Sequence, residues 1–412
     1  MSDAARVVDA VWRVEGARIV AAVAAATGDL GLAEDVAQEA VLEALTSWAG
    51  SGVPANPGAW LTTVARRRAV DAWRRRGRLA ERYAAIADTL DEASDDPWQP
   101  IGDEVLRLVF TACHPALSRE SQVALTLRVV SGLSTEEIAR LLLTSVPTIQ
   151  ARITRAKKSL RAAGIQFAAP EPSEWGPRLT GVLGVVYLLF TEGYAATSGE
   201  RWVRPDLADE AIRLGRVIVA LLPREPEALG LLALMEFQRS RFAARERADG
   251  SAVPLEAQDR SRWDRGQIAR AIQLRRRAAA AAEARGTGPG PYALQAAIAE
   301  CHATARDIES TDWRRIVELY DRLGRIAPGP IVELNRIVAL AMADGPGPAL
   351  GLLGRLDEAR GIAHLLPGIR GEFLARLGRR TEAIEQLRQA VELAQNAAQR
   401  RHLAERIAAL ED

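Results

Sequence analysis

Cysteine is almost missing from this sequence of 412 residues, which contains only Cys113 and Cys301. Neither lies in a CxxC pair or near a histidine at zinc-site spacing, so neither a disulfide framework nor a structural zinc is expected. The adjacent Cys113 and His114 have no further ligand types nearby, and we interpret them as a packed cysteine and a capping or surface histidine. A reducing, cytoplasmic location fits this composition.

Long apolar runs are missing as well. The longest strongly apolar stretch, VLGVVYLLF at 182–190, is too short to span a bilayer, and we interpret it as a buried helix. The first residues, MSDAARVVDAVWRVEG, lack the basic start and continuous apolar run of a signal peptide. We therefore expect no membrane association.

An excess of charge of one sign is also missing, because 54 Lys and Arg face 53 Asp and Glu. Any attraction for nucleic acid must come from local clusters rather than from the field of the whole molecule. The hydrophobic share of 48% and charged share of 26% are ordinary for a globular protein and argue against disorder as its main state. The length suggests two or three domains.

Alternation of β-branched residues is scarce, whereas apolar residues recur at spacings of three and four, which predicts an all-α fold. Two stretches interrupt this pattern: the acidic DTLDEASDDPWQP at 88–100 and the proline-rich FAAPEPSEWGP at 167–177. RGTGPGPY at 285–292 reads as a further loop. The expected organisation is a helical domain at 1–78, an acidic linker at 79–100, a second helical domain at 101–165 and a helical C-terminal region at 166–412.

The stretch STEEIARLLLTSVPTIQARITRAKKSL at 134–160 predicts two helices joined by a short turn. Ser134 and Glu137 form a capping box, so the first helix begins at residue 135. The turn falls near 143–145, Pro147 occupies the first turn of the second helix, and that helix runs to about residue 160. The pattern is typical of a helix-turn-helix.

The second of these helices has two different faces. Residues of its inner face repeat at three and four, namely Val146, Ile149, Ile153, Ala156 and Leu160. On the other side lie Thr148, Ala151, Arg152, Arg155 and Lys158, which suit base edges near the helix start and phosphates further along. For the segment taken alone, the alternative is an amphipathic helical hairpin with a solvated basic face.

A second cationic helix is predicted in NPGAWLTTVARRRAVDAWRRR at 56–76, where Asn56 caps the helix and Pro57 opens it. Seven arginines fall between residues 66 and 78. The outer face combines Thr63, Arg66, Arg67 and Arg74 with the nearby Trp60, a mixture that suits phosphates and unstacked bases.

An acidic helix precedes it in GLAEDVAQEAVLEALTSW at 31–48. Its alanines, Val41, Leu45 and Trp48 form the inner face, while Glu34, Asp35, Gln38 and Glu39 are expected to cluster on the exposed side. Because acidic residues repel DNA, this patch is expected to bind another protein.

With these three segments in order, residues 5–165 resemble an extracytoplasmic-function (ECF) sigma factor of the bacterial sigma-70 family. The resemblance implies that AEDVAQEA belongs to region 2 and docks on the β′ clamp helices of core RNA polymerase, which would also contact the chain through its β flap. PGAWLTTVARRRAVDAWRRR matches the helix that engages and melts the −10 element. LSTEEIARLLLTSVPTIQARITRAKKSLR matches the region 4 helix-turn-helix that reads the −35 element.

The site residues implied by the resemblance fall into three sets. For polymerase they are Glu34, Asp35, Gln38 and Glu39; for the −10 element Trp60, Thr63, Arg66, Arg67 and Arg74; for the −35 element Thr148, Gln150, Ala151, Arg152, Arg155 and Lys158. The polymerase performs the chemistry, so the chain is not expected to be an enzyme or to need a cofactor. An operator-binding helix-turn-helix regulator with a helical sensory or partner-binding domain is the alternative, although it gives no reason for the acidic helix.

Two residues depart from the family pattern. Leu143 stands at a turn position usually held by Gly, so it either accepts φ > 0 or enters a different turn. Arg67 stands where Asn is common, which weakens the case for a base-specific contact there. The acidic segment 88–104 resembles the linker that passes through the polymerase near the RNA path, or else it is a solvated tether.

The C-terminal region carries degenerate repeats typical of tetratricopeptide (TPR) helical pairs. Small and apolar residues recur in one frame, as in Gly378, Ala383, Leu387 and Ala390, in Ala349, Leu353 and Leu356, and in Ala211, Gly215, Ile218 and Pro223. The chain thus resembles the ECF subgroup with a TPR-like extension, which would regulate the sigma domains or bind a protein or peptide. TEGYA at 191–195 and QDRSRWD at 258–264 resemble motifs of that extension. We interpret the second as ion pairs and a Trp anchor rather than an acid/base site.

Overall fold

The structure, a computed structural model, describes residues 3–75, 103–142, 144–165, 167, 170, 174–194, 205–247, 253–356, 365–394 and 397–411. These residues form helices and connecting turns, which confirms the all-α prediction. The chain divides into two compact units, Met1–Val186 and Tyr187–Asp412. The acidic linker at 79–100 lies outside the described residues.

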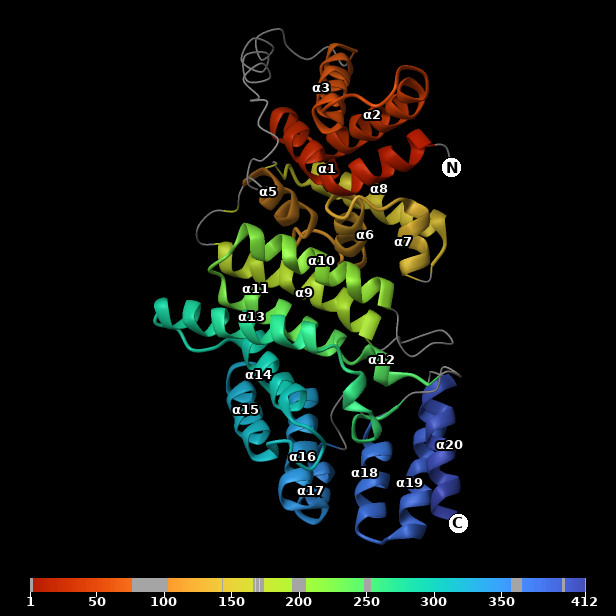
Figure 1. Cartoon of the computed structure of the whole chain (residues 1–412), viewed down its shortest axis with the longest axis vertical. Coiled ribbons are helices and arrows are strands. Elements are labelled where there is room, and N and C mark those ends of the chain that lie inside the picture. Colours follow the sequence, from red (N-terminus) through yellow and green to blue (C-terminus); the bar gives the residue numbers. More distant parts are fainter. Residues whose placement is uncertain are drawn as a thin grey trace. The chain divides into compact units, whose positions relative to one another are not determined.

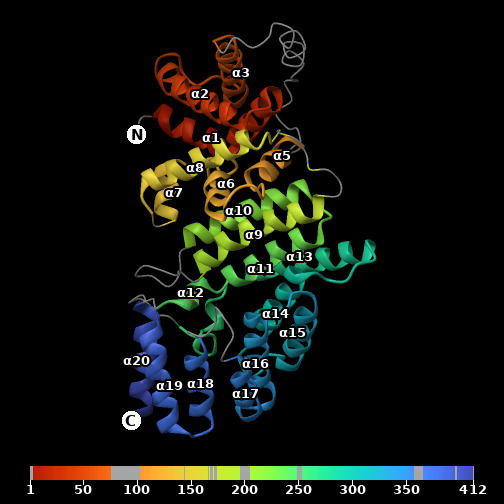
Figure 2. The same ribbon diagram turned by 180° about the vertical axis from the view of Figure 1, so that it is seen from behind.

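The first unit contains an N-terminal bundle and a helix-turn-helix module (Figures 1 and 2). The N-terminal bundle consists of α1 (Asp3–Thr27), α2 (Leu30–Ser51) and α3 (Pro57–Arg75). The helix-turn-helix module consists of α5 (Asp103–Ala112), α6 (Arg119–Val129), α7 (Thr135–Leu141) and α8 (Val146–Ala162). The unit ends within α9 (Trp175–Tyr194).

Local capping starts the helices of the N-terminal bundle where the sequence predicts them. The Asp29 carboxylate accepts a hydrogen bond from Leu32 N at the start of α2, and Asn56 Oδ1 accepts one from Ala59 N at the start of α3. The three helices pack on one another through buried alanines and larger apolar residues such as Leu61. Taken by itself, the bundle therefore leaves one face of α2 and one face of α3 uncovered.

The helix-turn-helix prediction is confirmed. The capping box of Ser134 and Glu137 is present, and Pro147 lies in the first turn of α8. Ile149, Ile153, Ala156 and Leu160 are buried, as their spacing predicts. Leu143 lies outside the described residues, so the family departure at the turn stays open.

Cys113 and His114 also have the structural roles expected of them. Cys113 is buried with its Sγ 3.4 Å from Thr126 Oγ1, and burial raises the pKa of this thiol to about 11. His114 Nδ1 accepts a hydrogen bond from Ala116 N, which closes the turn after α5. The thiol is therefore protonated at neutral pH and packs as an apolar group.

In the second unit α11 packs on α10, α13 and α14, and from α14 onward each α-helix packs on the next one in the chain (Figure 1). Its first part contains the end of α9, α10 (Pro205–Leu221), α11 (Pro226–Arg239), α12 (Phe242–Arg245), the 3-10 turns η1 (Leu255–Ala257) and η2 (Arg260–Arg262), and α13 (Arg265–Ala284). Its second part contains α14 (Pro291–Thr304), α15 (Trp313–Ile326), α16 (Pro330–Asp344), α17 (Pro346–Leu353), η3 (Gly354–Leu356), α18 (Leu366–Arg376), α19 (Arg380–Leu393) and α20 (Ala397–Glu411).

Small residues set the spacing of these helices. A Cβ atom on Gly371 of α18 would lie 2.8 Å from Leu387 Cγ of α19, so only glycine permits this approach. Ala383, Leu387 and Ala390 are buried as the repeat pattern predicts. The structure confirms helices throughout the described part of the C-terminal region, and the TPR frame stays a prediction.

Two further expectations concern residues 182–190 and 285–292. Most of VLGVVYLLF is buried within α9, and no helix of the described residues is long and apolar enough to cross a membrane. The loop predicted at 285–292 separates α13 from α14, with Pro291 in the first turn of α14.

Candidate functional site

The exposure predicted for Glu34 is wrong. Its side chain lies on α2, as expected, but the residue is only 5% exposed. Arg128 Nε of α6 donates to Glu34 Oε1 at 2.7 Å, and Lys157 Nζ of α8 donates to Glu34 Oε2. The periodicity of α2 places Glu34 on the outer face of the N-terminal bundle, but the helix-turn-helix module covers that face.

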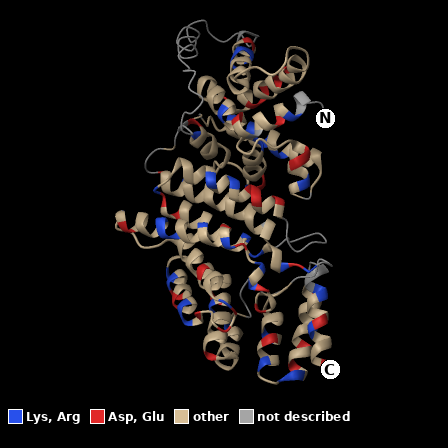
Figure 3. Ribbon diagram, in the orientation of Figure 1, with Lys and Arg blue, Asp and Glu red and all other residues tan. Residues whose placement is uncertain are grey.

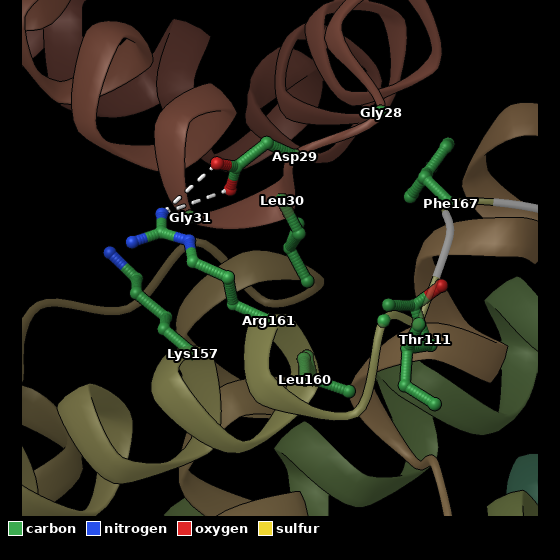
Figure 4. A pocket seen from close by; sticks show the side chains of 11 residues that line it. Gly28, Asp29, Leu30, Gly31, Thr111, Lys157, Leu160, Arg161 and Phe167 are labelled. Atoms are coloured by element: carbon green, nitrogen blue, oxygen red, sulfur yellow. Dashed lines mark hydrogen bonds and ion pairs between the residues drawn. The ribbon is translucent and has the colours of Figure 1, made fainter.

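Two more carboxylates of α2 and its cap join this contact. Lys157 Nζ also donates to Asp35 Oδ1 at 2.8 Å, and Arg161 Nη2 lies 3.0 Å from Asp29 Oδ2 (Figure 4). Asp35 stays exposed, with 64% of its side chain accessible. We call these six residues the α2–α8 ion cluster: Asp29, Glu34, Asp35, Arg128, Lys157 and Arg161.

An uncharged contact lies beside the α2–α8 ion cluster. The Trp12 indole Nε1 of α1 donates to the carbonyl oxygen of Gly132, between α6 and α7, at 3.0 Å. Gly132 has φ +69°, and a Cβ atom there would lie 3.1 Å from Trp12 Nε1. Glycine is therefore required both by the backbone and by the indole. Helices α1 and α5 also pack together.

A cavity of about 220 Å³ opens beside the ion cluster. Its walls come from both parts of the first unit and include Asp29, Lys157, Leu160, Arg161 and Phe167 (Figure 4). The carboxylates of the ion cluster already neutralise the two cations of this wall. The cavity is thus a gap in the contact between the N-terminal bundle and the helix-turn-helix module.

The contact between Glu34 and Lys157 shifts the pKa values of both residues. Burial raises the pKa of Glu34, but the charges of Lys157 and Arg128 and their hydrogen bonds outweigh burial, so this pKa lies below its usual value. Burial lowers the pKa of Lys157, but Glu34 and Asp35 outweigh it and raise that pKa. Both residues are therefore charged across the whole neutral range.

The other two predicted polymerase-binding residues lie further along α2. Gln38 is half-buried, and Glu39 is exposed but pairs with Arg68 of α3 at 2.8 Å. Arg68 also pairs with Glu43 at 2.6 Å, and neither of these two residues was predicted as part of a site. Pairing between helices leaves no periodic signal within either helix, so the sequence did not indicate it.

The predicted −10 residues on α3 differ in their exposure to solvent. Thr63 and Arg67 are exposed, although Arg67 Nη2 pairs with Glu43 at 2.9 Å. Trp60 is half-buried, with its ring centroid 5.4 Å from that of Trp48, and Arg66 is half-buried. The side chain of Arg74 lies outside the described residues.

The predicted −35 residues lie on α8 with most of their side chains accessible. Gln150, Ala151, Arg155 and Lys158 are exposed, and Arg152 is half-buried. The Thr148 hydroxyl is 2.8 Å from Ser145 Oγ, so it takes part in capping α8.

Arg152 and Arg155 also line a surface hollow of about 450 Å³ together with Ser118, the N-cap of α6, and the carboxylate of Glu120. Backbone N–H groups at a helix start and nearby guanidinium groups favour a phosphate. Helix α8 carries only basic charged residues and α2 only acidic ones, whereas α3, α5, α6 and α7 carry both signs (Figure 3).

Comparison with known protein families agrees with this geometry. The family model Sigma-70 region 2 matches residues 14–79, and the model Sigma-70, region 4 matches residues 107–160. A family of unknown function, DUF6596, matches residues 178–279. The first unit thus defines a protein with sigma-70 regions 2 and 4, corresponding to the N-terminal bundle and the helix-turn-helix module.

Individual relatives show to which group of sigma-70 proteins the chain belongs. The chain is 42% identical over 383 residues to an uncharacterized protein of Rhizobium meliloti (strain 1021), covering 90% of this chain and 88% of the relative. It is 32% identical over 148 residues to the ECF RNA polymerase sigma factor SigK of Mycobacterium ulcerans (strain Agy99), covering 35% of this chain and 78% of the relative. It is 34% identical over 140 residues to SigL of Mycobacterium tuberculosis (strain ATCC 35801 / TMC 107 / Erdman), covering 33% and 76%. The chain belongs to the ECF RNA polymerase sigma factors.

The buried position of Glu34 predicts a specific dependence of stability on pH. At pH 7, Glu34→Gln should lower the free energy of unfolding of the first unit by about 3–5 kcal/mol, because a buried ion pair is broken and two half-buried cations lose the carboxylate that they share. Since the folded pKa of Glu34 is depressed, its contribution is complete above about pH 4.3 and is lost as the pH falls further. The difference between the two proteins should therefore shrink below that pH. Urea unfolding followed by circular dichroism measures it.

Glu104→Gln is the control, because Glu104 is an exposed carboxylate of the same unit. Its effect should stay within about 0.5 kcal/mol at every pH. A Glu34→Gln effect as small as that of the control at pH 7 would contradict the burial of this ion pair.

Proposed function

We propose that this sigma factor binds core RNA polymerase through α2, engages the −10 element through α3 and reads the −35 element through α8. In this assignment residues 1–78 form region 2, 79–100 the linker and 101–165 region 4. Glu34, Asp35, Gln38 and Glu39 contact the β′ clamp helices, and region 4 contacts the β flap. The polymerase performs the chemistry, so this cytoplasmic function requires neither a catalytic residue nor a cofactor of the chain.

We further propose that region 4 covers the polymerase-binding face of α2 until polymerase displaces it. The observation that carries this proposal is Glu34, which is 5% exposed and shared by Arg128 and Lys157. A polymerase helix that binds Glu34 must first replace these two cations. The affinity measured for core polymerase is then the intrinsic affinity multiplied by the fraction of open molecules.

The first test uses the double variant Arg128→Met/Lys157→Met. It removes both cations that cover Glu34 and leaves α2 unchanged, so the open form becomes dominant. We expect the dissociation constant for core polymerase, measured by fluorescence anisotropy without DNA, to fall on the order of tenfold, which corresponds to about 1.4 kcal/mol of closure.

Lys158→Met is the matched control, since it removes one charge from the exposed side of the same helix. Its affinity for polymerase should stay within a factor of two of the wild type. Unchanged or weaker binding by the double variant would overturn the proposed covering of α2.

The proposed −35 contacts divide into two kinds. Arg152 and Arg155 face the hollow beside the start of α6, which suits a backbone phosphate. Gln150 is exposed near the start of α8, where side chains reach base edges. Thr148 is the weaker candidate for a base contact, because its hydroxyl already bonds to Ser145.

Substitutions at these positions should have different effects on the holoenzyme. Arg155→Ala should weaken every promoter alike and reduce the slope of log affinity against log salt by about one. Gln150→Ala should change the preference among −35 sequences by about 1–3 kcal/mol at one base pair. Transcription from a promoter library at several salt concentrations measures both. Altered sequence choice in Arg155→Ala with an unchanged salt slope would refute this division.

For the −10 element we propose contacts by Trp60, Thr63, Arg66, Arg67 and Arg74. Arg67 lies 2.9 Å from Glu43, so DNA must compete with this carboxylate for its guanidinium. Exposed ion pairs are weak, typically below about 1 kcal/mol, so a phosphate can replace Glu43 at little cost.

The helical region 166–412 is proposed to regulate the sigma domains, by covering their binding surfaces or by recruiting a protein or peptide partner. A truncation after Tyr194 keeps α9 whole, including Trp175, whose ring centroid lies 5.0 Å from that of Phe110. Transcription by this variant with core polymerase should rise if the region inhibits and fall if it activates. Activity equal to that of the full chain would reject a regulatory role.

A further inference from the structure

The second unit buries three arginines that no carboxylate of the described residues pairs with. Arg241 is 8% exposed, Arg245 5% and Arg260 6%. Other arginines of this unit do meet acids: Arg239 lies 2.7 Å from Asp209, and Arg216 lies 2.6 Å from Glu236. A buried guanidinium normally has an anionic partner, because leaving water without one costs several kcal/mol.

Two aromatic rings hold the three guanidinium groups close together. Arg245 Cζ lies 3.4 Å from the Tyr194 ring centroid, and Arg241 Nη2 donates to the Tyr194 hydroxyl at 2.8 Å. Arg241 Cζ lies 5.5 Å and Arg260 Cζ 5.1 Å from the Trp263 ring centroid. The end of α9, the α11–α12 turn and η2 therefore bring three positive charges to one aromatic-lined place, which we call the arginine–aromatic cluster.

Backbone carbonyl oxygens offset part of the positive charge of Arg245 and Arg260. Arg260 donates to the carbonyl oxygens of His302 and Ala305 at 2.8 and 3.0 Å, at the end of α14. Arg245 Nη1 donates to the carbonyl oxygen of Tyr194 at the end of α9. A helix C-terminus supplies about half a unit of negative charge, so these two arginines are each compensated in part. This also corrects the expectation of ion pairs in QDRSRWD for Arg260, whereas the Trp263 anchor is confirmed by its burial.

Arg241 donates to no backbone carbonyl oxygen or carboxylate within the part of the chain that the structure describes. Its Nη2 donates to the Tyr194 hydroxyl, and its Nε is buried without a hydrogen-bond partner among the described residues. The indole Nε1 of Trp263 is likewise buried and unpartnered. Two N–H donors beside three cations are an arrangement that an oxyanion satisfies.

The titration behaviour of the neighbours agrees with a strong positive field. Burial, together with the charges of Arg241 and Arg260, lowers the pKa of His302 to about 3, so this imidazole stays neutral. Burial raises the pKa of Tyr194, but Arg241 and Arg245 outweigh it and lower that pKa. Both shifts have the sign that nearby guanidinium charges produce.

We propose that the arginine–aromatic cluster binds a small-molecule oxyanion, a phosphate or carboxylate group, held by the guanidinium groups of Arg241 and Arg245 and supported by Trp263. A planar guanidinium offers parallel N–H groups that match two oxygens of either group. Such a site gives the second unit a ligand input, and it does not depend on the assignment of the polymerase or DNA contacts.

The test compares thermal unfolding of the full chain in sodium phosphate and in sodium chloride at equal ionic strength and pH. Wild type should show a midpoint that rises with phosphate concentration, since a ligand that binds only the folded state stabilises it. In Arg241→Met that rise should disappear. In chloride the unfolding midpoint of Arg241→Met should match or exceed that of the wild type, because the variant lacks an uncompensated buried charge. If Arg241 had only a structural role, the midpoint of the variant would be lower in both salts.

Arg239→Met is the matched control, because Arg239 lies two residues away and already pairs with Asp209. It should keep the phosphate dependence. Equilibrium dialysis with radioactive phosphate should give at least tenfold weaker binding in Arg241→Met than in Arg239→Met, and a parallel series with succinate distinguishes a carboxylate from a phosphate ligand.

Wild type whose midpoint and dialysis respond to neither phosphate nor succinate would overturn the proposal. So would an Arg241→Met variant that keeps the full response. If Arg241→Met fails to fold, Arg245→Lys serves instead, since it keeps the charge but loses the planar fork, and it should weaken phosphate binding while leaving the midpoint in chloride unchanged.

Discussion

The arrangement of the first unit depends on one buried carboxylate. Glu34 lies between Arg128 and Lys157, and its removal from water is offset only while both cations remain in place. The N-terminal bundle and the helix-turn-helix module therefore stay together as an all-or-none contact. The Trp12 to Gly132 hydrogen bond and the Asp29–Arg161 pair also join the N-terminal bundle to the helix-turn-helix module.

A contact that contains buried ion pairs opens differently from a contact made of apolar side chains alone. When the two parts open, Glu34, Arg128 and Lys157 regain water, so hydration offsets part of the lost ion pairing. Both Glu34 and Lys157 keep their charge throughout the neutral range, so a change in pH near neutrality does not open the contact. A competing set of charges can do so.

The second unit differs from the first, because small residues set the distances between its helices. Its helices approach one another through glycine and alanine, as at Gly371 against Leu387. Against that background the arginine–aromatic cluster stands out, because Arg241 is buried beside two other cations without the carboxylate that Arg239 and Arg216 have.

The sequence by itself determined the helices and their caps, because Ser134, Glu137, Asn56 and Pro147 act within one turn of the chain. It also determined the family, through three motifs in order, and the buried faces of α2, α3 and α8. Only the tertiary structure decided which outer faces remain free. Glu34 and Arg67 read as solvated on their own helices, yet each meets a partner on another helix, and helical periodicity carries no record of such a partner. Burial of charge is a property of two surfaces brought together, so it appeared only once the helices were placed.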